Sequence, residues 1–363
     1  MLETNGHGGN WAEAAGRYGC APGDLLDYSS NINPLGPPPA LKRLWAEEWD
    51  FLTRYPDPFV RELREAISAK YGIAPGSVLA ANGAAEAIDL VMRTLKPKRV
   101  GIVDPSFAEY REAAEKCGAA IESITGAERD GFAVSTEGLL SLLSRVDALF
   151  LGQPNNPTGL FRDRARLARL ARHAEQCGAR LILDEAFIDF VPDEAGLTMI
   201  GEAASSRAVI VIRSMTKFYA IPGLRLGYAV AEPGFVRAMK RLQVPWSVNH
   251  IAQRAGVLAL QDTEYERRSR QWIGEERAWL TCQLNRIGCR PFEGAANFLL
   301  VQLGDDFPSA ADLQHRLGRR CILIRRCATF AGLDDRYIRL AVRTRHENKR
   351  LIAALEAAIR QEE

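Results

Sequence analysis

The stretch AVIVIRSMTKFYAIPGLRLGYAVAE (residues 208–232) contains two short apolar runs, 208–214 and 224–232, joined by a segment with a Pro-Gly turn. Each run is typical of a buried strand, because strands covered on both faces are almost continuously apolar. Lys217 follows the first run, and Arg225 lies in the second. A lysine at a strand end is usually solvated, so its role has to be judged from the rest of the chain.

The same pattern extends outward from this stretch. Short strand-like runs alternate with helical patterns along the middle of the chain, and these runs are residues 99–105, 147–154 and 179–190. Alternation of buried strands with helices predicts a mostly parallel sheet covered by helices on both faces. We therefore predict an α/β domain over about residues 45–240.

The C-terminal part of the chain has a looser pattern. A helical stretch follows residue 249 and runs to about residue 287, and the strand-like runs NFLLVQL, CILIRR and YIRLAVRT alternate with helices beyond it. This order predicts a smaller α+β domain. We expect residues 1–44 to form an N-terminal arm and part of the small domain, residues 45–240 the large domain, and residues 241–363 the small C-terminal domain.

Composition limits the partners and the compartment. The net charge of +2 over 363 residues gives no electrostatic reason to expect nucleic acid or an anionic membrane as a partner. The chain begins without a signal peptide and has no apolar run of about 20 residues, so we expect a cytoplasmic protein. Its seven cysteines include no C-x-x-C pair, so we expect no metal site, no need for a disulfide and mostly buried thiols.

Several segments place small or polar residues at strand ends or helix starts, where open α/β sheets bind ligands. In NGAAEAIDL a turn of small residues leads into a helix, so free N–H groups at Ala84 and Ala85 can hold a phosphate. QPNNPTG fixes a turn that projects the amide of Asn156. LILDEAF ends an apolar strand with Asp184, whose buried carboxylate needs a partner, and PSFAEY supplies an aromatic ring at Phe107.

Together these residues supply the groups that bind pyridoxal 5′-phosphate. The cofactor needs an amine as its covalent anchor, a carboxylate at the ring nitrogen, phosphate donors, an aromatic ring and a donor to the ring oxygen. In that order, the predicted residues are Lys217, Asp184, the group Gly83, Ala84, Ala85, Ser214 and Arg225, then Phe107, and finally Asn156.

At this point the sequence resembles the fold-type I pyridoxal-phosphate enzymes, the aspartate aminotransferase superfamily. NGAAE, PSF, NNPTG, DEAF, SMTK and GLRLGY occur in the family's order over nearly the whole chain, which makes the match highly specific. The resemblance implies an α/β fold whose large domain has a mostly parallel seven-stranded sheet, a smaller α+β domain, a homodimer and pyridoxal phosphate as cofactor.

Two groups within the superfamily are similar to this chain, the L-threonine-O-3-phosphate decarboxylases and the histidinol-phosphate aminotransferases. HGGN near the N-terminus, YSSNINPLGPP, RYPDP and VPWSVN resemble the decarboxylases more. The resemblance implies decarboxylation of O-phospho-L-threonine to (R)-1-amino-2-propanol O-2-phosphate and CO₂, which supplies the aminopropanol arm of cobalamin. A histidinol-phosphate or aromatic aminotransferase is the alternative, because the pyridoxal-phosphate motifs alone leave the reaction open.

The resemblance also implies residue roles. The positions that match substrate contacts are His7, Gly8, Asn31, Asn156, Arg325 and Arg339. Tyr55 matches a tyrosine that reaches the cofactor phosphate of the partner subunit. Arginines within apolar strand patterns usually have an anionic partner, and Arg343 is a further candidate for the same cluster. Phe187 departs from the aminotransferases, which usually have tyrosine there.

A ligand-sensing regulator built on the same fold is the alternative from a different class. Such a protein carries a DNA-binding domain before the fold, whereas the first family motif here begins within ten residues of the start. We therefore expect an enzyme.

Overall fold

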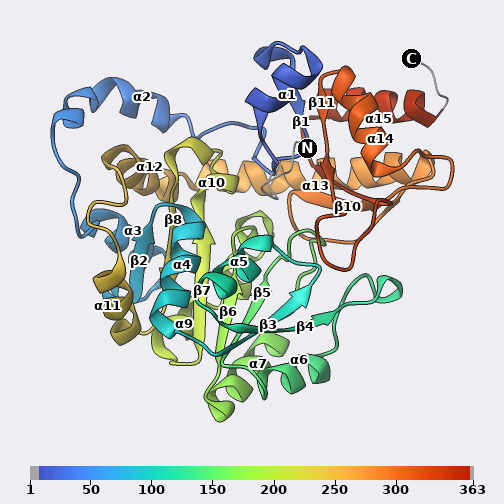
Figure 1. Cartoon of the computed structure of the whole chain (residues 1–363). Coiled ribbons are helices and arrows are strands. Elements are labelled where there is room, and N and C mark those ends of the chain that lie inside the picture. Colours follow the sequence, from blue (N-terminus) through green and yellow to red (C-terminus); the bar gives the residue numbers. More distant parts are fainter. Residues whose placement is uncertain (1–7, 360–363) are drawn as a thin grey trace.

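The structure, a computed structural model, describes residues 8–359 (Figure 1). Its centre is a seven-stranded sheet. The strands, in spatial order, are β2 (Val78–Ala81), β8 (Gly227–Val230), β7 (Val209–Ser214), β6 (Arg180–Asp184), β5 (Ala148–Gly152), β3 (Arg99–Asp104) and β4 (Ala120–Thr125). Strand β8 is antiparallel to both neighbours and the other pairs are parallel, so the predicted mostly parallel seven-stranded sheet is confirmed.

Helices cover both faces of this sheet, as the apolar runs predict. The helices on one face are α4 (Gly83–Leu95), α5 (Ala108–Lys116) and α11 (Pro233–Leu242). The helices on the other face are α3 (Arg61–Tyr71), α6 (Thr136–Leu143), α7 (Arg164–Cys177), α9 (Ile200–Ser205) and α12 (His250–Gln261). Successive strand residues alternate between the two faces, so Ile210 packs in the first core and Val211 in the second.

A second, antiparallel sheet contains the arginines predicted to bind substrate. Its strands, in spatial order, are β12 (Arg325–Arg326), β13 (Tyr337–Ala341), β10 (Phe298–Gln302) and β9 (Arg290–Pro291). The helices nearby are α13 (Thr263–Arg286), α14 (Ala310–Arg319) and α15 (Arg345–Ile359). Figure 1 shows α13 crossing the molecule between the seven-stranded sheet and this smaller group of elements.

The first part of the N-terminal segment, which contains α1 (Trp11–Tyr18) and β1 (Leu26–Asp27), packs against the C-terminal elements. Helix α2 (Ala40–Glu47) instead packs on α12 beside the large sheet. Strand β1 pairs in parallel with β11 (Ile322–Leu323), just before β12, so residues 26–27 lie beside residues 322–323. This pairing brings the residues after β1 to the edge of the second sheet.

Two elements are shorter than expected from the sequence. The run at 179–190 is a strand only as far as Asp184, and a 3-10 turn forms at Ile188–Phe190. The run at 224–232 begins as a 3-10 turn, and β8 starts at Gly227. In both places the apolar sequence continues into buried irregular backbone, so hydrophobicity alone does not mark the strand end.

The cysteines differ from the expectation. Cys20 and Cys321 form a disulfide across a separation of 301 residues, and Cys177 and Cys282 are exposed. Of the seven cysteines only Cys20, Cys289 and Cys327 are buried, so the prediction of mostly buried thiols was wrong. The disulfide itself was not predicted. The bond fastens the segment between α1 and β1 to the residue before β11, because pairing of these strands brings both cysteines together.

We expect five thiols per chain to react with a thiol reagent in denaturant without reductant, because five cysteines are free. Prior reduction should expose all seven cysteines of the sequence. Cys20→Ser should lower the free energy of unfolding by about 2–4 kcal/mol, since the bond closes a long loop in the unfolded chain. Reaction of seven thiols without reductant would contradict the disulfide.

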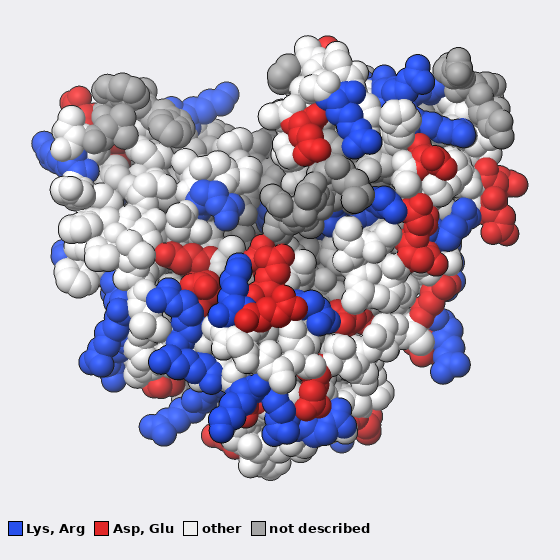
Figure 2. Space-filling view, viewed as in Figure 1, with Lys and Arg blue, Asp and Glu red and all other residues white. Residues whose placement is uncertain are grey.

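No helix within residues 8–359 is long and apolar enough to cross a bilayer. Acidic and basic side chains lie next to one another over the face shown in Figure 2.

Candidate active site

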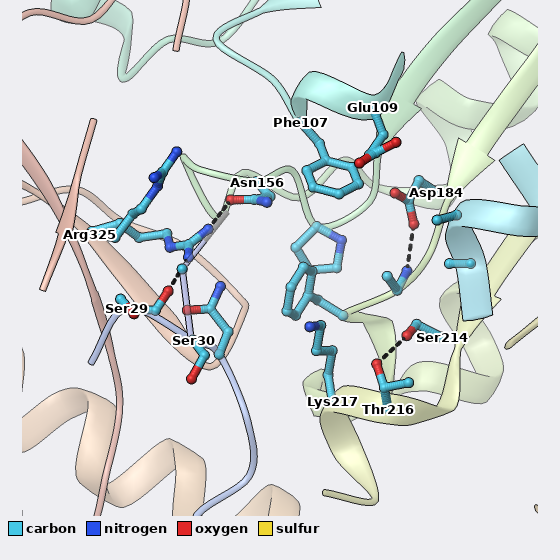
Figure 3. Close-up of a pocket in the computed structure, with 18 of the residues that line it drawn as sticks. Ser29, Ser30, Phe107, Glu109, Asn156, Asp184, Ser214, Thr216, Lys217 and Arg325 are labelled. Carbon is cyan, nitrogen blue, oxygen red and sulfur yellow. Dashed lines mark hydrogen bonds between the residues drawn. The ribbon is translucent and has the colours of Figure 1, made fainter. Parts of the chain in front are cut away.

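A cavity of about 330 Å³ lies where the carboxyl ends of β6 and β7 face the second sheet. The predicted site residues that line it are Gly8, Asn31, Ala84, Ala85, Phe107, Asn156, Asp184, Ser214, Lys217, Arg225, Arg325 and Arg339. The structure thus brings together side chains that are up to 331 residues apart in the chain, from Gly8 to Arg339. Figure 3 shows Lys217 and Asp184 extending into the cavity from different elements, with Phe107 above it.

The predicted phosphate-binding turn forms a concave surface at the start of α4. Gly83 has a φ of +83°, and a Cβ there would lie 2.7 Å from Nη2 of Arg225. A Cβ at Gly227 would likewise lie 2.7 Å from the backbone nitrogen of Ala84. Glycine at both positions therefore lets the guanidinium and β8 approach the first N–H groups of the helix. The helix N-terminus and the guanidinium both favour an anion here.

Hydroxyl groups complete this surface at the end of β7. Ser214 Oγ lies 2.8 Å from Thr216 Oγ1, and both residues line the cavity. Thr216 belongs to the short helix α10 (Met215–Phe218), which also carries Lys217. We did not predict Thr216 as a site residue, although it lies in the quoted SMTK motif.

Asp184 is held by two hydrogen bonds at the end of β6. Tyr110 donates its hydroxyl to Oδ2 at 2.7 Å, and the Ala186 N–H donates to Oδ1 at 3.0 Å. Burial raises the pKa of the Asp184 carboxyl, although these bonds and the Lys217 charge oppose the shift. A positively charged ring N–H would offset this cost by pairing with the carboxylate.

Tyr110 is a positioning residue that sequence reasoning missed. Its ring stacks on Phe150 at 4.8 Å between centroids and is fully buried. Its edge-on contact with Phe107, at 5.7 Å between ring centroids, links the carboxylate to the aromatic wall of the cavity. The PSFAEY motif contains this tyrosine, but the sequence does not show which partner its hydroxyl reaches.

Lys217 has an unusually acidic ammonium group. Burial, followed by the charges of Arg339 and Arg225, lowers its pKa from 10.5 to about 8, while Asp184 acts in the opposite direction. A useful fraction of the amine is therefore neutral, and nucleophilic, near physiological pH.

This shift predicts how cofactor attachment depends on pH. In the cofactor-free protein, the rate of covalent attachment of pyridoxal phosphate should rise by about tenfold per pH unit and level off near pH 8, because only the neutral amine reacts. Stopped-flow absorbance measures this rate. A rate that keeps rising toward pH 10.5, the ordinary lysine value, would contradict the shift.

Two arginines of the second sheet line the wall of the cavity that faces Lys217. Arg325 and Arg339 are directly opposite each other in the register of β12 and β13, and their side chains are buried. Arg325 donates to Thr329 Oγ1 at 2.9 Å, and its guanidinium lies 5.4 Å from the ring centre of Phe330. Like charges on facing residues repel, and an anionic ligand between them lowers that repulsion.

Arg339 connects this wall to the loop that carries Asn156. Its Nη1 donates to Asn156 Oδ1 at 2.6 Å, and its Nη2 donates to the Ser29 carbonyl at 2.7 Å. The amide oxygen of Asn156 is therefore used by the arginine, and its NH₂ group donates to no described residue. Nearby, the buried Oδ1 of Asn31 has no hydrogen-bond partner within residues 8–359. Both amides are suited to a polar ligand in the cavity.

Some predicted residues lie elsewhere. Gly83 shapes the cavity through Arg225 without lining it. Tyr55 is 82% exposed in the single chain, outside the cavity. His7 lies outside the described residues. Arg343 does not join the arginine pair, because its guanidinium pairs with Glu347 at 2.6 Å.

The residues present fit pyridoxal phosphate. Glycines at the start of α4 leave room for a phosphate beside an arginine and two hydroxyl groups. A buried carboxylate and a lysine of lowered pKa line the same cavity, together with an aromatic ring. The volume is at the lower end of the range for cofactor pockets. Phe187 also lines this cavity, where its ring offers no hydroxyl to the cofactor.

Known proteins resemble the chain over most of its length. The model of the family "Aminotransferase class I and II" matches residues 23–355. The threonine-phosphate decarboxylase of Salmonella typhimurium is 43% identical over 98% of this chain and 96% of its own length. The adenosylcobalamin biosynthesis bifunctional protein CobDQ of Leptospira interrogans is 33% identical over 96% of this chain and 40% of its own length.

A solved structure agrees with the fold. The histidinol-phosphate aminotransferase from Clostridium acetobutylicum has a TM-score of 0.87 at 34% identity, covering 93% of this chain and 100% of that one. Since the family model and a 43% identical relative both cover nearly all of the chain, it belongs to the class I and II aminotransferase family.

Proposed function

We propose that this enzyme decarboxylates O-phospho-L-threonine to (R)-1-amino-2-propanol O-2-phosphate and CO₂, for the aminopropanol arm of cobalamin. The observation that carries this reaction is the pair Arg325 and Arg339, two buried guanidiniums on the wall opposite Lys217. A phosphorylated amino acid has two anionic groups, and guanidinium groups bind both carboxylate and phosphate. The 43% identity to a threonine-phosphate decarboxylase supports the choice of substrate and bond.

Pyridoxal 5′-phosphate is the cofactor of this enzyme. When bound, it accepts the electrons of the bond broken at the substrate's α carbon. We propose that Lys217 anchors it and that Asp184 pairs with the ring nitrogen. The predicted contacts of its remaining groups are Gly83, Ala84, Ala85, Ser214 and Arg225 at the phosphate, Phe107 on the ring and Asn156 at the ring oxygen.

The two arginines are assigned to different anions by their distance from the reacting carbon. After burial, the charge of Arg339 is the largest cause of the lowered pKa of Lys217, and Arg339 also donates to Asn156, the proposed partner of the ring oxygen. Arg339 is therefore assigned as the guanidinium on the cofactor side. The carboxylate is bonded directly to the α carbon and the phosphate is attached through the β carbon, so Arg339 binds the carboxylate and Arg325 the phosphate.

Binding of the phosphate at a remote point orients the substrate. With its phosphate at Arg325, its rotation about the α carbon is restricted, and Gly8 and Asn31 close the cavity from the N-terminal segment. The carboxylate can then be aligned for cleavage. Once released from the cofactor, Lys217 is placed to give a proton to the α carbon, because its pKa of about 8 lets it hold and lose a proton near neutral pH.

The deciding experiment uses carboxyl-labelled O-phospho-L-threonine with and without 2-oxoglutarate. The expected result is release of labelled CO₂ at the same rate in both cases. A histidinol-phosphate aminotransferase is the second candidate, favoured by the 34% identity to a solved enzyme of that name. Glutamate formed from 2-oxoglutarate with histidinol phosphate as donor, and no CO₂, would replace the decarboxylase proposal with it.

We also propose a homodimer in which Tyr55 reaches the partner's cofactor phosphate. Tyr55 packs against Trp246 at 4.8 Å between ring centroids, and both are exposed. The neighbouring Phe59 and Val244 are 54% and 67% exposed. An exposed group of large apolar side chains is typical of an interaction surface.

Mixed dimers test the role of Tyr55. Tyr55→Phe and Lys217→Ala should each have low activity, and hybrids of the two should regain activity at one site, because that site takes its lysine and its tyrosine from different chains. Activity of the mixture equal to the sum of the separate variants would place Tyr55 in its own subunit's site.

We propose that the protein lies in the cytoplasm and that its chain divides into residues 1–44, 45–240 and 241–363. The pairing of β1 with β11 supports grouping the N-terminal arm with the C-terminal domain. Because disulfides are rare in the cytoplasm, Cys20 and Cys321 should be free thiols in the cell, form their bond only after lysis, and be alkylated in freshly lysed cells. Protection of both from alkylation would contradict a cytoplasmic location.

A further inference from the structure

A cluster of buried charges lies at the carboxyl ends of β6 and β7. At its centre Arg213, whose side chain is 1% exposed, faces three carboxylates. Its Nε lies 3.6 Å from Glu185 Oε2 and its Nη1 lies 3.6 Å from Asp189 Oδ2. Its Nη2 contacts Glu194 Oε1. We call the group Arg213, Glu185, Asp189 and Glu194 the ion cluster.

The ion cluster occupies the face of the sheet opposite the cavity. Side chains alternate between faces along a strand, so the neighbours Asp184 and Glu185 point in opposite directions, as do Ser214 and Arg213. Two positions earlier in the strands, Ile182 and Ile212 pack in the core beneath α4, α5 and α11. Leu183 and Val211 pack in the core on the other face. Glu185 of the ion cluster therefore directly follows Asp184, and Arg213 directly precedes Ser214.

Glu185 is fixed on all sides. Thr198 donates its hydroxyl to Oε2 at 2.6 Å, and the Met199 N–H donates to Oε1 at 2.9 Å. Its own N–H donates to the Ile212 carbonyl at 2.8 Å, in the neighbouring strand. The residue after Asp184 therefore has little freedom to move.

The segment that carries Lys217 is held at both ends. Arg213 precedes the lysine by four residues, and Tyr219 follows it by two. Tyr219 donates its hydroxyl to Glu266 Oε1 on α13 at 2.7 Å. Arg270, also on α13, lies 3.4 Å from Glu266 Oε2 and donates from Nε to the Asp189 carbonyl at 2.9 Å. The anchor of Tyr219 and the ion cluster are therefore one connected network.

A gain in folding stability does not by itself explain why these charges are buried. Removing several charges from water costs free energy, and apolar residues of similar volume often stabilise a core as well or better. The hydrogen bonds of this network, from Thr198 and Met199 to Glu185 and from Tyr219 to Glu266, do however fix the directions of these side chains more narrowly than apolar packing does. Its members adjoin the residues that must meet the cofactor at defined angles.

We propose that Glu185, Arg213 and Tyr219 are positioning residues that hold Asp184 and Lys217 in a fixed relation to the cofactor. This inference rests on the cofactor, and it is independent of which bond at the substrate is broken. A misplacement of reacting groups by about 1 Å lowers a rate by up to roughly a hundredfold, so smaller tilts should cost roughly tenfold.

The test uses two conservative variants of the holoenzyme. Glu185→Gln keeps an amide that can bond Thr198 and Met199 but removes the charge facing Arg213. Tyr219→Phe removes only the hydroxyl that binds Glu266, at the other end of the segment. For both we expect a changed visible circular dichroism band of the bound cofactor, and a fall in kcat of roughly tenfold with KM within about twofold.

The matched control is Glu122→Gln. Glu122 on the edge strand β4 pairs with Arg145, and its side chain is 33% exposed. This variant should keep the parent's circular dichroism and kcat. Melting temperatures of all three variants separate loss of stability from loss of positioning.

Two outcomes would overturn the proposal. Variants with lower melting temperatures but the parent's visible band and kcat would show that the network only stabilises the fold. The same would follow if Glu122→Gln changed the band as much as Glu185→Gln. If Glu185→Gln does not fold, Tyr219→Phe decides alone. The visible band needs no substrate, so this test stands whether or not O-phospho-L-threonine is decarboxylated.

Discussion

Replacing Lys217 by alanine should lower kcat by about four orders of magnitude or more, the scale seen when a covalent catalytic residue is removed. The variant loses both the amine that anchors the cofactor and the proposed proton donor to the α carbon. The rest of the cavity does not depend on this side chain, so the variant should still fold and bind the cofactor without a covalent bond.

Borohydride reduction followed by mass spectrometry checks the anchor directly. The parent should gain the mass of one cofactor per chain, and Lys217→Ala should gain none. A small primary amine added to the variant should restore part of the activity, because it can replace the missing base. Lys240→Ala is the control, since Lys240 is also partly buried but donates to the Pro58 carbonyl, outside the cavity. Cofactor coupling in Lys217→Ala would show that another lysine is the anchor.

The residues at the strand ends could be found from the sequence because a simple rule locates them. Asp184 and Ser214 each end an apolar run, and the carboxyl ends of parallel strands meet at one edge of a sheet. The family motifs then gave each residue a role. The structure brings these residues into one cavity, while their contacts with the cofactor stay predictions.

Contacts between distant segments could not be found in the same way. Tyr110 lies in a helix and is 74 residues from Asp184, whose carboxylate its hydroxyl reaches. Cys20 and Cys321 are 301 residues apart, and their pairing depends on β1 meeting β11. The local sequence pattern around each residue does not show which distant residue it contacts.

Two strands of the seven-stranded sheet were missed because their sequences are weak signals. The edge strand β4 is half-exposed and reads AIESIT, which mixes polar and apolar residues. β2 has only four residues, VLAA, two of them alanine. The ion cluster, in contrast, could have been predicted. Arg213 lies in an apolar run, and the rule applied to Arg325 and Arg339 also predicts an anionic partner for it, which the ion cluster provides.

The arginine assignment predicts that two similar variants differ in which substrates they affect. Arg325→Gln should lower kcat/KM for O-phospho-L-threonine by about 10²–10³, the expected cost of losing one partner of a buried charge pair. For L-threonine, which lacks the phosphate, the same variant should change little. Arg339→Gln should lower both rates by a similar factor, because both substrates have the α-carboxylate.

The ratio of the two substrates is therefore the measured quantity, and each variant serves as the control for the other. Arg325 is held by Thr329 and Phe330, and Arg339 by Asn156 and Ser29, so glutamine at either position leaves the other guanidinium in place. The phosphorylated substrate should lose its advantage only in Arg325→Gln. If the advantage disappears in Arg339→Gln instead, the two anions bind the other way round. The α carbon would then be turned so that a different bond faces the cofactor, and decarboxylation itself would lose its geometric basis.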